Sequence, residues 1–200
     1  MAEGDFGHLD VLPDDVRDIF MWLCQDVASL SRKWEFYLGA FGQPDNFVIM
    51  DASPMAFNLI EESLRTDMTM AVCRLSDPVR SCGRENLNFR ALEAFYDQDA
   101  KLKKLIDDFV ASCEPVRLHR NKLVGHSDKV TRLSPQQVMI PQIKRSDMEA
   151  IMAGASAIIN HVAKVYGNTG FAFGTPGAAG ADALFYWLKK GFDNRMNPGV

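Results

Sequence analysis

One stretch of this 200-residue sequence gathers arginine, histidine, asparagine and lysine within twelve positions. It runs from residue 117 to residue 128 as Arg-Leu-His-Arg-Asn-Lys-Leu-Val-Gly-His-Ser-Asp. Guanidinium groups bind phosphate or carboxylate oxygens through parallel hydrogen bonds, and an imidazole changes its charge near neutral pH. The stretch therefore holds residue types that can bind a polyanion, and histidine is the type that can also move a proton.

The charge distribution points to the same part of the chain. The whole sequence carries 22 basic and 26 acidic residues, so it is no polycation built to coat nucleic acid. Residues 1–100 hold 8 basic and 18 acidic residues, whereas residues 101–200 hold 14 basic and 8 acidic ones. Any site for a polyanion is therefore expected in the second half.

Arg120 has an unusual place on the helix expected around it. On a helical wheel it lies about 40° from Val116, inside the stripe of apolar side chains that Leu105, Phe109 and Leu123 continue. An arginine there must extend to solvent, pair with an acid or face a wet cleft, because an unpaired buried charge costs several kcal/mol. A purely structural interpretation pairs it with an acid of the N-terminal half, and the candidates are Glu61, Glu62 and Asp77.

The elements that must position this stretch are helices. Apolar residues recur at spacings of three and four, and proline, glycine and capping residues mark the ends. Helices are predicted over residues 13–38, 53–76, 88–95, 102–124 with a break at Pro115, 146–165 with a capping box starting at Ser146, and 181–190. Residues 39–52 and 79–87 are predicted as irregular connections. The fold class is all-α, an up-and-down bundle of about five to six helices.

The predicted domain organisation follows the glycine content. Residues 1–166 form the helical bundle, residues 167–180 a glycine-rich connection, and residues 181–200 a C-terminal helix and tail. That last helix is expected to dock through Leu184, Trp187 and Leu188 on the same domain or on a neighbouring subunit.

Several classes of protein are excluded by what the sequence lacks. The four cysteines stand apart, and His119 and His126 are too far apart along a helix to share one zinc, so no metal and no cofactor are expected. No apolar run reaches the length of a membrane span, and the N-terminus has no signal-peptide pattern. A cytoplasmic protein with reduced, buried cysteines and no membrane partner is expected.

The spacing of Arg120-Asn121 and His126 resembles the Arg-polar-x4-His motif of the HEPN superfamily of small helical bundles. The longer pattern, residues 120–122 followed by residues 126–128, is most similar to the abortive-infection branch of the AbiU type. An early helix with Trp34 and Tyr37, and then residues 74–77 ahead of residues 86–89, resembles the layout of that branch. The resemblance covers roughly residues 15–165.

This resemblance implies a metal-independent endoribonuclease whose composite site forms where two motifs meet across a homodimer, in a defence or toxin–antitoxin setting. His126 would be the acid or base, Arg120 would hold the phosphate, and Asn121 would orient them. Arg117, His119, Lys122 and Asp128 would bind the substrate. RNA is then the implied substrate, and an antitoxin protein is the implied partner.

Two points limit what the resemblance carries over. In one branch of the superfamily a tyrosine two residues after the histidine is modified, but here that position is Asp128. Some HEPN proteins also keep the fold without cleaving RNA. The alternative function is therefore a non-catalytic module that binds a partner protein or a nucleotide.

Overall fold

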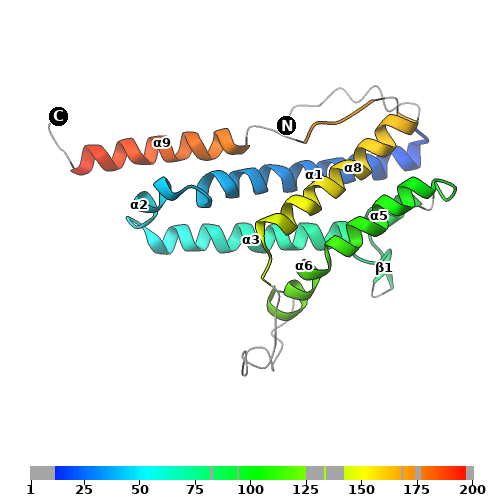
Figure 1. The fold of residues 1–200 in the computed structure, drawn as a ribbon, viewed down its shortest axis with the longest axis horizontal. Helices are drawn as coiled ribbons and strands as arrows, with labels where there is room; N and C mark the ends of the chain where they lie inside the picture. Colours follow the sequence, from blue (N-terminus) through cyan, green and yellow to red (C-terminus); the bar gives the residue numbers. More distant parts are fainter. Residues whose placement is uncertain are drawn as a thin grey trace. The chain divides into compact units, whose positions relative to one another are not determined.

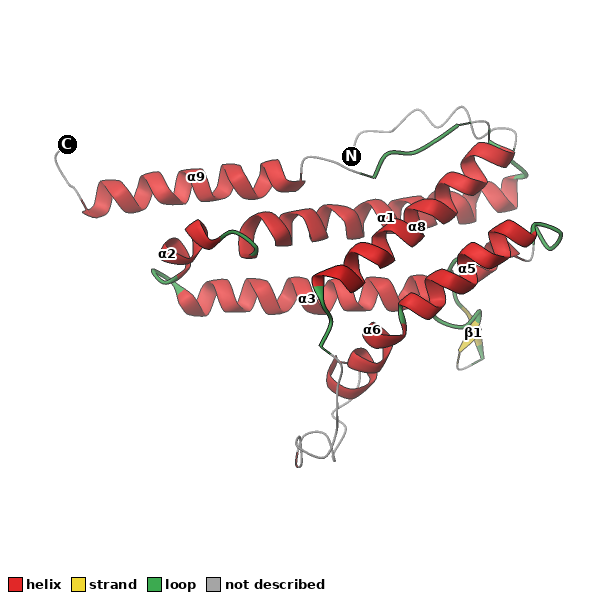
Figure 2. Cartoon of the chain, in the orientation of Figure 1, coloured by secondary structure: helices red, strands yellow, loops and turns green. Residues whose placement is uncertain are grey.

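The computed structural model describes residues 12–81, 83–93, 95–124, 133, 142–167, 169–173 and 177–196. Within them the chain forms eight α-helices and one two-stranded hairpin, which confirms the all-α bundle (Figure 2). The α-helices are α1 (Asp14–Phe41), α2 (Phe47–Met50), α3 (Pro54–Ser76), α4 (Arg90–Glu93), α5 (Ala100–Ser112), α6 (Glu114–His119), α8 (Arg145–Tyr166) and α9 (Gly177–Met196). The prediction of five to six helices was too low, because the single turns α2 and α4 and the division between α5 and α6 add to the count.

The chain divides into two compact units. Unit 1 comprises Met1–Ala28 and Thr69–Phe173, and unit 2 comprises Ser29–Met68 and Gly174–Val200. The long helices α1 and α3 each contribute residues to both units. Each unit has its own buried residues.

The first half of α1 supplies one wall of the unit 1 core. Asp14 and Asp15 occupy its first turn, where carboxylates interact favourably with the positive end of the helix dipole. Its predicted stripe is buried: the side chains at Val16, Phe20 and Leu23 are at most 1% exposed. The helix ends at Phe41, three residues beyond the predicted boundary.

Helices α5 and α8 lie side by side in unit 1 and enclose most of its remaining core (Figure 1). They approach closely where α8 carries Gly154, since a Cβ there would lie 3.3 Å from the Phe109 ring. Phe109 also meets Phe89 edge-on, with ring centroids 5.0 Å apart. The contact explains why α8 has a glycine in its interior.

Two side chains predicted to lie in these stripes do not. Leu105 is only half-buried, and Ile106 is buried in its place, while Val165 is 55% exposed. Leu105 lies about 60° and Val165 about 80° from the centre of the buried stripe on a helical wheel, so both are at the edge of their stripes.

The segment 79–87, predicted as a loop, forms a short hairpin. Strand β1 (Arg80–Ser81) pairs antiparallel with β2 (Arg84–Glu85), so that Arg80 lies opposite Glu85. Gly83 adopts a φ of 77° in the turn, a conformation that glycine reaches at little cost. Each strand has only two residues, so the alternation of apolar and polar side chains that marks a strand is too short to detect in the sequence.

The start of α8 differs by one residue from the prediction. The predicted capping box began at Ser146, but the helix begins at Arg145 and its N-cap is Lys144. Asp147 accepts a hydrogen bond from the backbone N–H of Lys144 at 2.8 Å. The carboxylate still stabilises the helix start, although the cap lies two residues before Ser146.

In unit 2 the second half of α1 and the first half of α3 run together. Tyr37 donates a hydrogen bond to Glu61 at 2.9 Å, and Lys33 forms an ion pair with Asp67. The connection predicted as irregular contains a 3-10 turn, η2 (Pro44–Asn46), and then α2. The Asn46 side chain holds this connection by donating to the carbonyl groups of Gly39 and Ala40.

Helix α9 is twice as long as predicted, because it spans Gly177–Met196 instead of residues 181–190. Ala181 and Phe185 are buried against Ala40, Ile49 and Met50, and this packing outweighs the low helix propensity of the glycines at its start. Leu188 is partly buried in the same cluster. Trp187 is 67% exposed, and docking of this helix through Leu184, Trp187 and Leu188 on the same domain or on a neighbouring subunit stays a prediction.

The described residues test the expectations of buried cysteines and of no membrane-spanning helix. Cys24, Cys73 and Cys113 are free, buried thiols, as predicted. Burial raises the pKa of Cys24 and Cys113 to about 12, so neither is a ready nucleophile. No helix in the described ranges has the length and apolarity that crossing a membrane requires.

Candidate functional site

Arg120 follows the last residue of α6 and pairs with a carboxylate from the end of α3. Its Nη1 donates to both carboxylate oxygens of Asp77, at 3.0 and 2.9 Å. The two side chains are 20% and 22% exposed, so the pair lies at the edge of solvent. Of the three acids considered as partners for Arg120, the structure therefore selects Asp77.

The position of Asp77 depends on the loop that follows it. Asn88 is fully buried, and its Nδ2 donates to the backbone carbonyl of Asp77 at 2.9 Å. Asn86 donates in the same way to the carbonyl of Pro78 at 2.8 Å. Side-chain amides thus satisfy the carbonyl groups left free where α3 ends, and they hold Asp77 in place.

These contacts bring three separated sequence segments together in unit 1. Residues 74–77 end α3, residues 86–89 return alongside them, and Arg120 approaches from the end of α6. Arg74 is exposed, and the Asp77 carboxylate is taken by Arg120 instead of by a neighbour on its own helix.

Asn121 completes the support of the guanidinium group. Its Oδ1 accepts a hydrogen bond from Nε of Arg120 at 3.0 Å. Nε and Nη1 are therefore both used, whereas Nη2 has no hydrogen-bond partner in the described ranges. A guanidinium held in this way can present Nη2 to an incoming anion without losing its own supports.

The backbone changes its winding at this same point. The predicted break at Pro115 is confirmed, because α5 ends at Ser112 and α6 begins at Glu114. From Arg120 to Val124 the chain then forms a π-helical segment, η3. Wider turns of this kind occur mostly as single turns inside α-helices and are frequent at functional sites. The segment also invalidates the helical wheel beyond Arg120, which assumed α-helical spacing.

The structure brings together only part of the predicted site. Arg120 and Asn121 are in direct contact, and Arg117 lies one turn earlier, 3.7 Å from Glu114 in an ion pair. His119 and Lys122 are half-buried on the same segment. His126 and Asp128 lie outside the described residues, so their predicted roles stay predictions.

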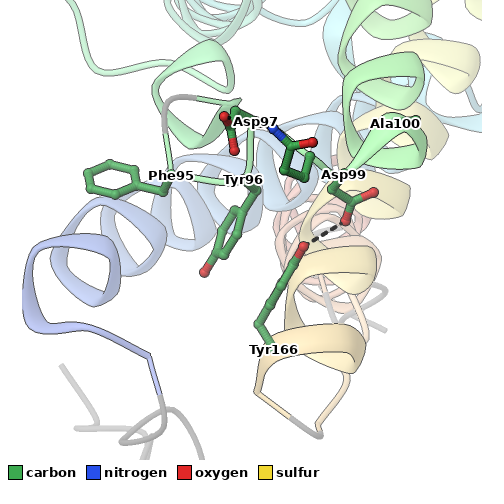
Figure 3. Close-up of a pocket in the computed structure, with 7 residues that line it drawn as sticks. Phe95, Tyr96, Asp97, Asp99, Ala100 and Tyr166 are labelled. Atoms are coloured by element: carbon green, nitrogen blue, oxygen red, sulfur yellow. Dashed lines mark hydrogen bonds between the residues drawn. The ribbon is translucent and has the colours of Figure 1, made fainter.

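A second polar cluster in unit 1 was not predicted. Asp99 accepts a hydrogen bond from the Tyr166 hydroxyl at 2.9 Å (Figure 3). It accepts another from Nε2 of His161 at 2.7 Å. Its other oxygen accepts from the backbone N–H of Leu102 at 2.8 Å and so caps α5. The side chains of Asp99 and His161 are only 12% and 8% exposed.

The pKa values in this cluster report its geometry. Burial alone would raise the pKa of Asp99, but the hydrogen bonds from Leu102, His161 and Tyr166 outweigh it and lower the pKa to about 2. Burial, with the Asp99 charge beside it, raises the pKa of Tyr166 to about 12. The cluster is therefore an ionised carboxylate surrounded by donors.

Two surface hollows lie on unit 1 away from Arg120. One, of about 470 Å³, is bordered by the turn before α5 and by Tyr166, whose ring stacks on Tyr96 with centroids 3.9 Å apart (Figure 3). The other, of about 530 Å³, lies between α8 and the segment of Gly170 to Ala172. Neither includes Arg120, and the described residues contain no group of three or more side chains suited to hold a metal ion.

Part of the second cluster had a signal in the sequence. An aspartate directly before a helix that starts at Ala100 is a typical N-cap, and that role could have been predicted. The contacts to His161 and Tyr166 could not, because they join residues 62 and 67 positions apart through the packing of α5 on α8.

Comparisons with known proteins give one match. The model of the family described as AbiU2, HEPN_AbiU2, matches residues 13–183. This range includes Asp77, Arg120, Asn121 and His126, and it extends past α8 into α9. No curated protein and no solved structure matches the chain.

Proposed function

Because the chain belongs to the AbiU2 family of HEPN domains, we propose that this abortive-infection domain is a metal-independent endoribonuclease. The observation that supports the proposal is the guanidinium group of Arg120, which Asp77 and Asn121 hold while Nη2 has no partner in the described part of the chain. A rigid cation at the edge of solvent suits the binding of a phosphodiester, since charge grows on the phosphate during cleavage.

The chemistry needs one group to remove a proton and one to supply a proton. In this proposal His126 takes the proton of an RNA 2′-hydroxyl, and the 2′-oxygen attacks the adjacent phosphorus. The bond from phosphorus to the 5′-oxygen of the next nucleotide breaks, and that oxygen receives a proton from the His126 of a second copy. Arg120 binds a non-bridging phosphate oxygen throughout, and Asn121 keeps the guanidinium oriented.

The remaining predicted residues contribute to binding. Arg117, His119 and Lys122 add basic side chains near the end of α6. Asp128 is the one acidic residue among the four predicted to bind the substrate. The composite arrangement requires a homodimer, and an antitoxin protein would regulate it in a toxin–antitoxin setting. These partners are parts of the same proposal.

Cleavage of end-labelled RNA by the purified dimer in the presence of EDTA tests the proposal. Arg120→Ala and His126→Ala should each reduce the cleavage rate by about a hundredfold or more, because each removes a group used in the transition state. Arg74→Ala is the matched control, since Arg74 is an exposed arginine near the same helix end and should retain activity. Unchanged cleavage in the Arg120→Ala variant would contradict the proposed mechanism.

The alternative is a non-catalytic module that binds a partner protein or a nucleotide. This alternative is favoured by the hydrogen bonds that Nη1 of Arg120 donates to both carboxylate oxygens of Asp77. A purely structural ion pair would make the same bonds. In that case the wild-type dimer cleaves no RNA, while Arg120→Ala lowers the free energy of unfolding. RNA cleavage by the wild type and the unfolding free energy of Arg120→Ala therefore separate the two functions.

A further inference from the structure

Helix α9 turns two large aromatic side chains toward solvent. Tyr186 is 54% exposed and Trp187 is 67% exposed, and their rings meet edge-on with centroids 5.3 Å apart. The ammonium group of Lys190 lies 4.9 Å from the centre of the Tyr186 ring and 5.5 Å from that of Trp187. We call Tyr186, Trp187 and Lys190 the aromatic–lysine surface.

The packing of α9 in unit 2 fixes which way this surface faces. Ala181 and Phe185 are buried, with Phe185 stacked on Phe57 at a centroid distance of 5.8 Å. Those residues lie on one side of the helix, and Lys190 lies about 140° away from Phe185 on a helical wheel. The two rings are therefore exposed because the opposite side of α9 is the one that packs.

The residues four positions before and four positions after Trp187 are small and uncharged. One helical turn away on its face are Ala183 and Gly191, and a Cβ at Gly191 would find no heavy atom within 4 Å. Asp182 and Asp193 lie on the Tyr186 side of the helix. The Trp187 ring therefore has open space on one side and the Lys190 cation on the other.

A second exposed tryptophan shows that exposure alone does not define such a surface. Trp22 on α1 is 60% exposed, nearly as much as Trp187. Its neighbours one turn away on the same helix face are Asp18 and Asp26, so a polyanion would be repelled there. The difference between the two tryptophans is the sign of the adjacent charge.

We infer that the aromatic–lysine surface of α9 binds single-stranded RNA, with a base stacked on Trp187 and a backbone phosphate at Lys190. Exposed aromatic rings beside cations are the means by which proteins bind single strands without reading sequence, because every base has a face that can stack. The choice of RNA as occupant rests on the proposed function, since RNA is the substrate proposed there. Trp187 then serves substrate binding and is distinct from the residues that carry the cleavage chemistry.

Fluorescence anisotropy with the full-length protein and a labelled 2′-O-methyl oligouridine of about 12 nucleotides tests the inference. This probe lacks the 2′-hydroxyl, so binding is measured without cleavage. Trp187→Ala should weaken binding about tenfold. Lys190→Gln should weaken it several-fold and reduce the salt dependence by about one phosphate contact. Trp22→Ala is the matched control and should bind like the wild type.

The outcomes separate this inference from the proposed function. Binding that depends on Trp187 in a protein that never cleaves RNA supports the inference and removes the ribonuclease. Cleavage with unchanged oligonucleotide binding by Trp187→Ala supports the ribonuclease and overturns the inference. A blue shift of Trp187 fluorescence on anionic phosphatidylglycerol vesicles, or a change of oligomeric state in Trp187→Ala, with RNA binding unaffected would also overturn it. Trp187→Ala and Lys190→Gln both change exposed side chains, and circular dichroism checks that α9 stays folded in each variant.

Discussion

Asp77 and Asp99 are two carboxylates of unit 1 that join segments far apart in the sequence. Asp77 follows the end of α3 and binds one cation, Arg120, at the edge of solvent. Asp99 precedes α5 and accepts three hydrogen bonds, from Leu102, His161 and Tyr166, with little exposure. Both sites use a carboxylate, but they differ in whether a hydrogen-bond donor beside it is left to bind a ligand.

That difference indicates which of the two can act on a substrate. Every donor around Asp99 is supplied by the protein, and a carboxylate of this kind stabilises the fold. The Asp77 pair leaves Nη2 of Arg120 without a partner in the described ranges, so an anion can bind beside it. The first region is therefore structural, and the second is the candidate site.

The largest effect is expected on stability at Asp99. Asp99→Ala removes the cap of α5 and leaves two partly buried donors, on His161 and Tyr166, without their acceptor. The free energy of unfolding in urea should fall by about 3 kcal/mol. RNA cleavage per folded molecule should stay the same. A loss below about 1 kcal/mol would mean that the Asp99 cluster is not a structural anchor.

Asp77→Asn should affect RNA cleavage more than stability, which is the reverse of what is expected for Asp99→Ala. The amide is isosteric but uncharged and has one acceptor oxygen, so it holds Nη1 of Arg120 less firmly. Cleavage should fall about tenfold to thirtyfold, whereas the free energy of unfolding should change by less than about 1 kcal/mol, because the pair is partly exposed. A stability loss without a loss of cleavage would show that the Asp77–Arg120 pair is structural and would contradict its role in cleavage.

Unfolding at acid pH tests the Asp99 cluster with a single variant, Asp99→Asn. The pKa of Asp99 is lowered from its ordinary 3.8 to about 2 in the folded protein. The ionised carboxylate therefore adds stability above pH 4, and this contribution is lost as the pH falls from about 4 to 2. The wild type should lose roughly 1–2 kcal/mol more than Asp99→Asn over this window, measured by urea unfolding at each pH. Parallel curves for the two proteins would contradict the assignment.

The smallest effect is expected from a single hydroxyl. Tyr166→Phe removes the hydrogen bond to Asp99 and keeps a ring that can stack on Tyr96. The free energy of unfolding should fall by about 1 kcal/mol. Tyr37→Phe in unit 2 is the matched control, because it removes a hydrogen bond of the same 2.9 Å length from the less buried Glu61. Equal losses would show that burial does not distinguish the two bonds.

Much of the fold was predictable because local signals agreed with the packing. Pro13 and an acidic first turn mark the start of α1, and Pro54 marks the start of α3. The predicted stripe of α1 is the one that is buried. The predictions were wrong where tertiary contacts outweighed propensity. The glycines before Ala181 indicated a loop, but burial of Ala181 and Phe185 extends α9 to Gly177.

The candidate site divides in the same way. The types and spacing of Arg120 and Asn121 were enough to single them out, because an arginine inside an apolar stripe requires an explanation. The sequence left three acids as its partner, since nothing local distinguishes Glu61, Glu62 and Asp77. Asn88 decides in favour of Asp77 by holding the end of α3 in place from a distance of 11 residues.

By itself the sequence determined the all-α class, most helix positions and a stretch of residues whose types suit anion binding, because periodicity and charge are local properties. Only the tertiary structure decided that Asp77 holds Arg120, that Asp99 is saturated by His161 and Tyr166, and that Trp187 faces solvent. Each of these depends on which helices pack against one another. The free energy of such packing comes from contacts between residues tens of positions apart, which no local pattern encodes.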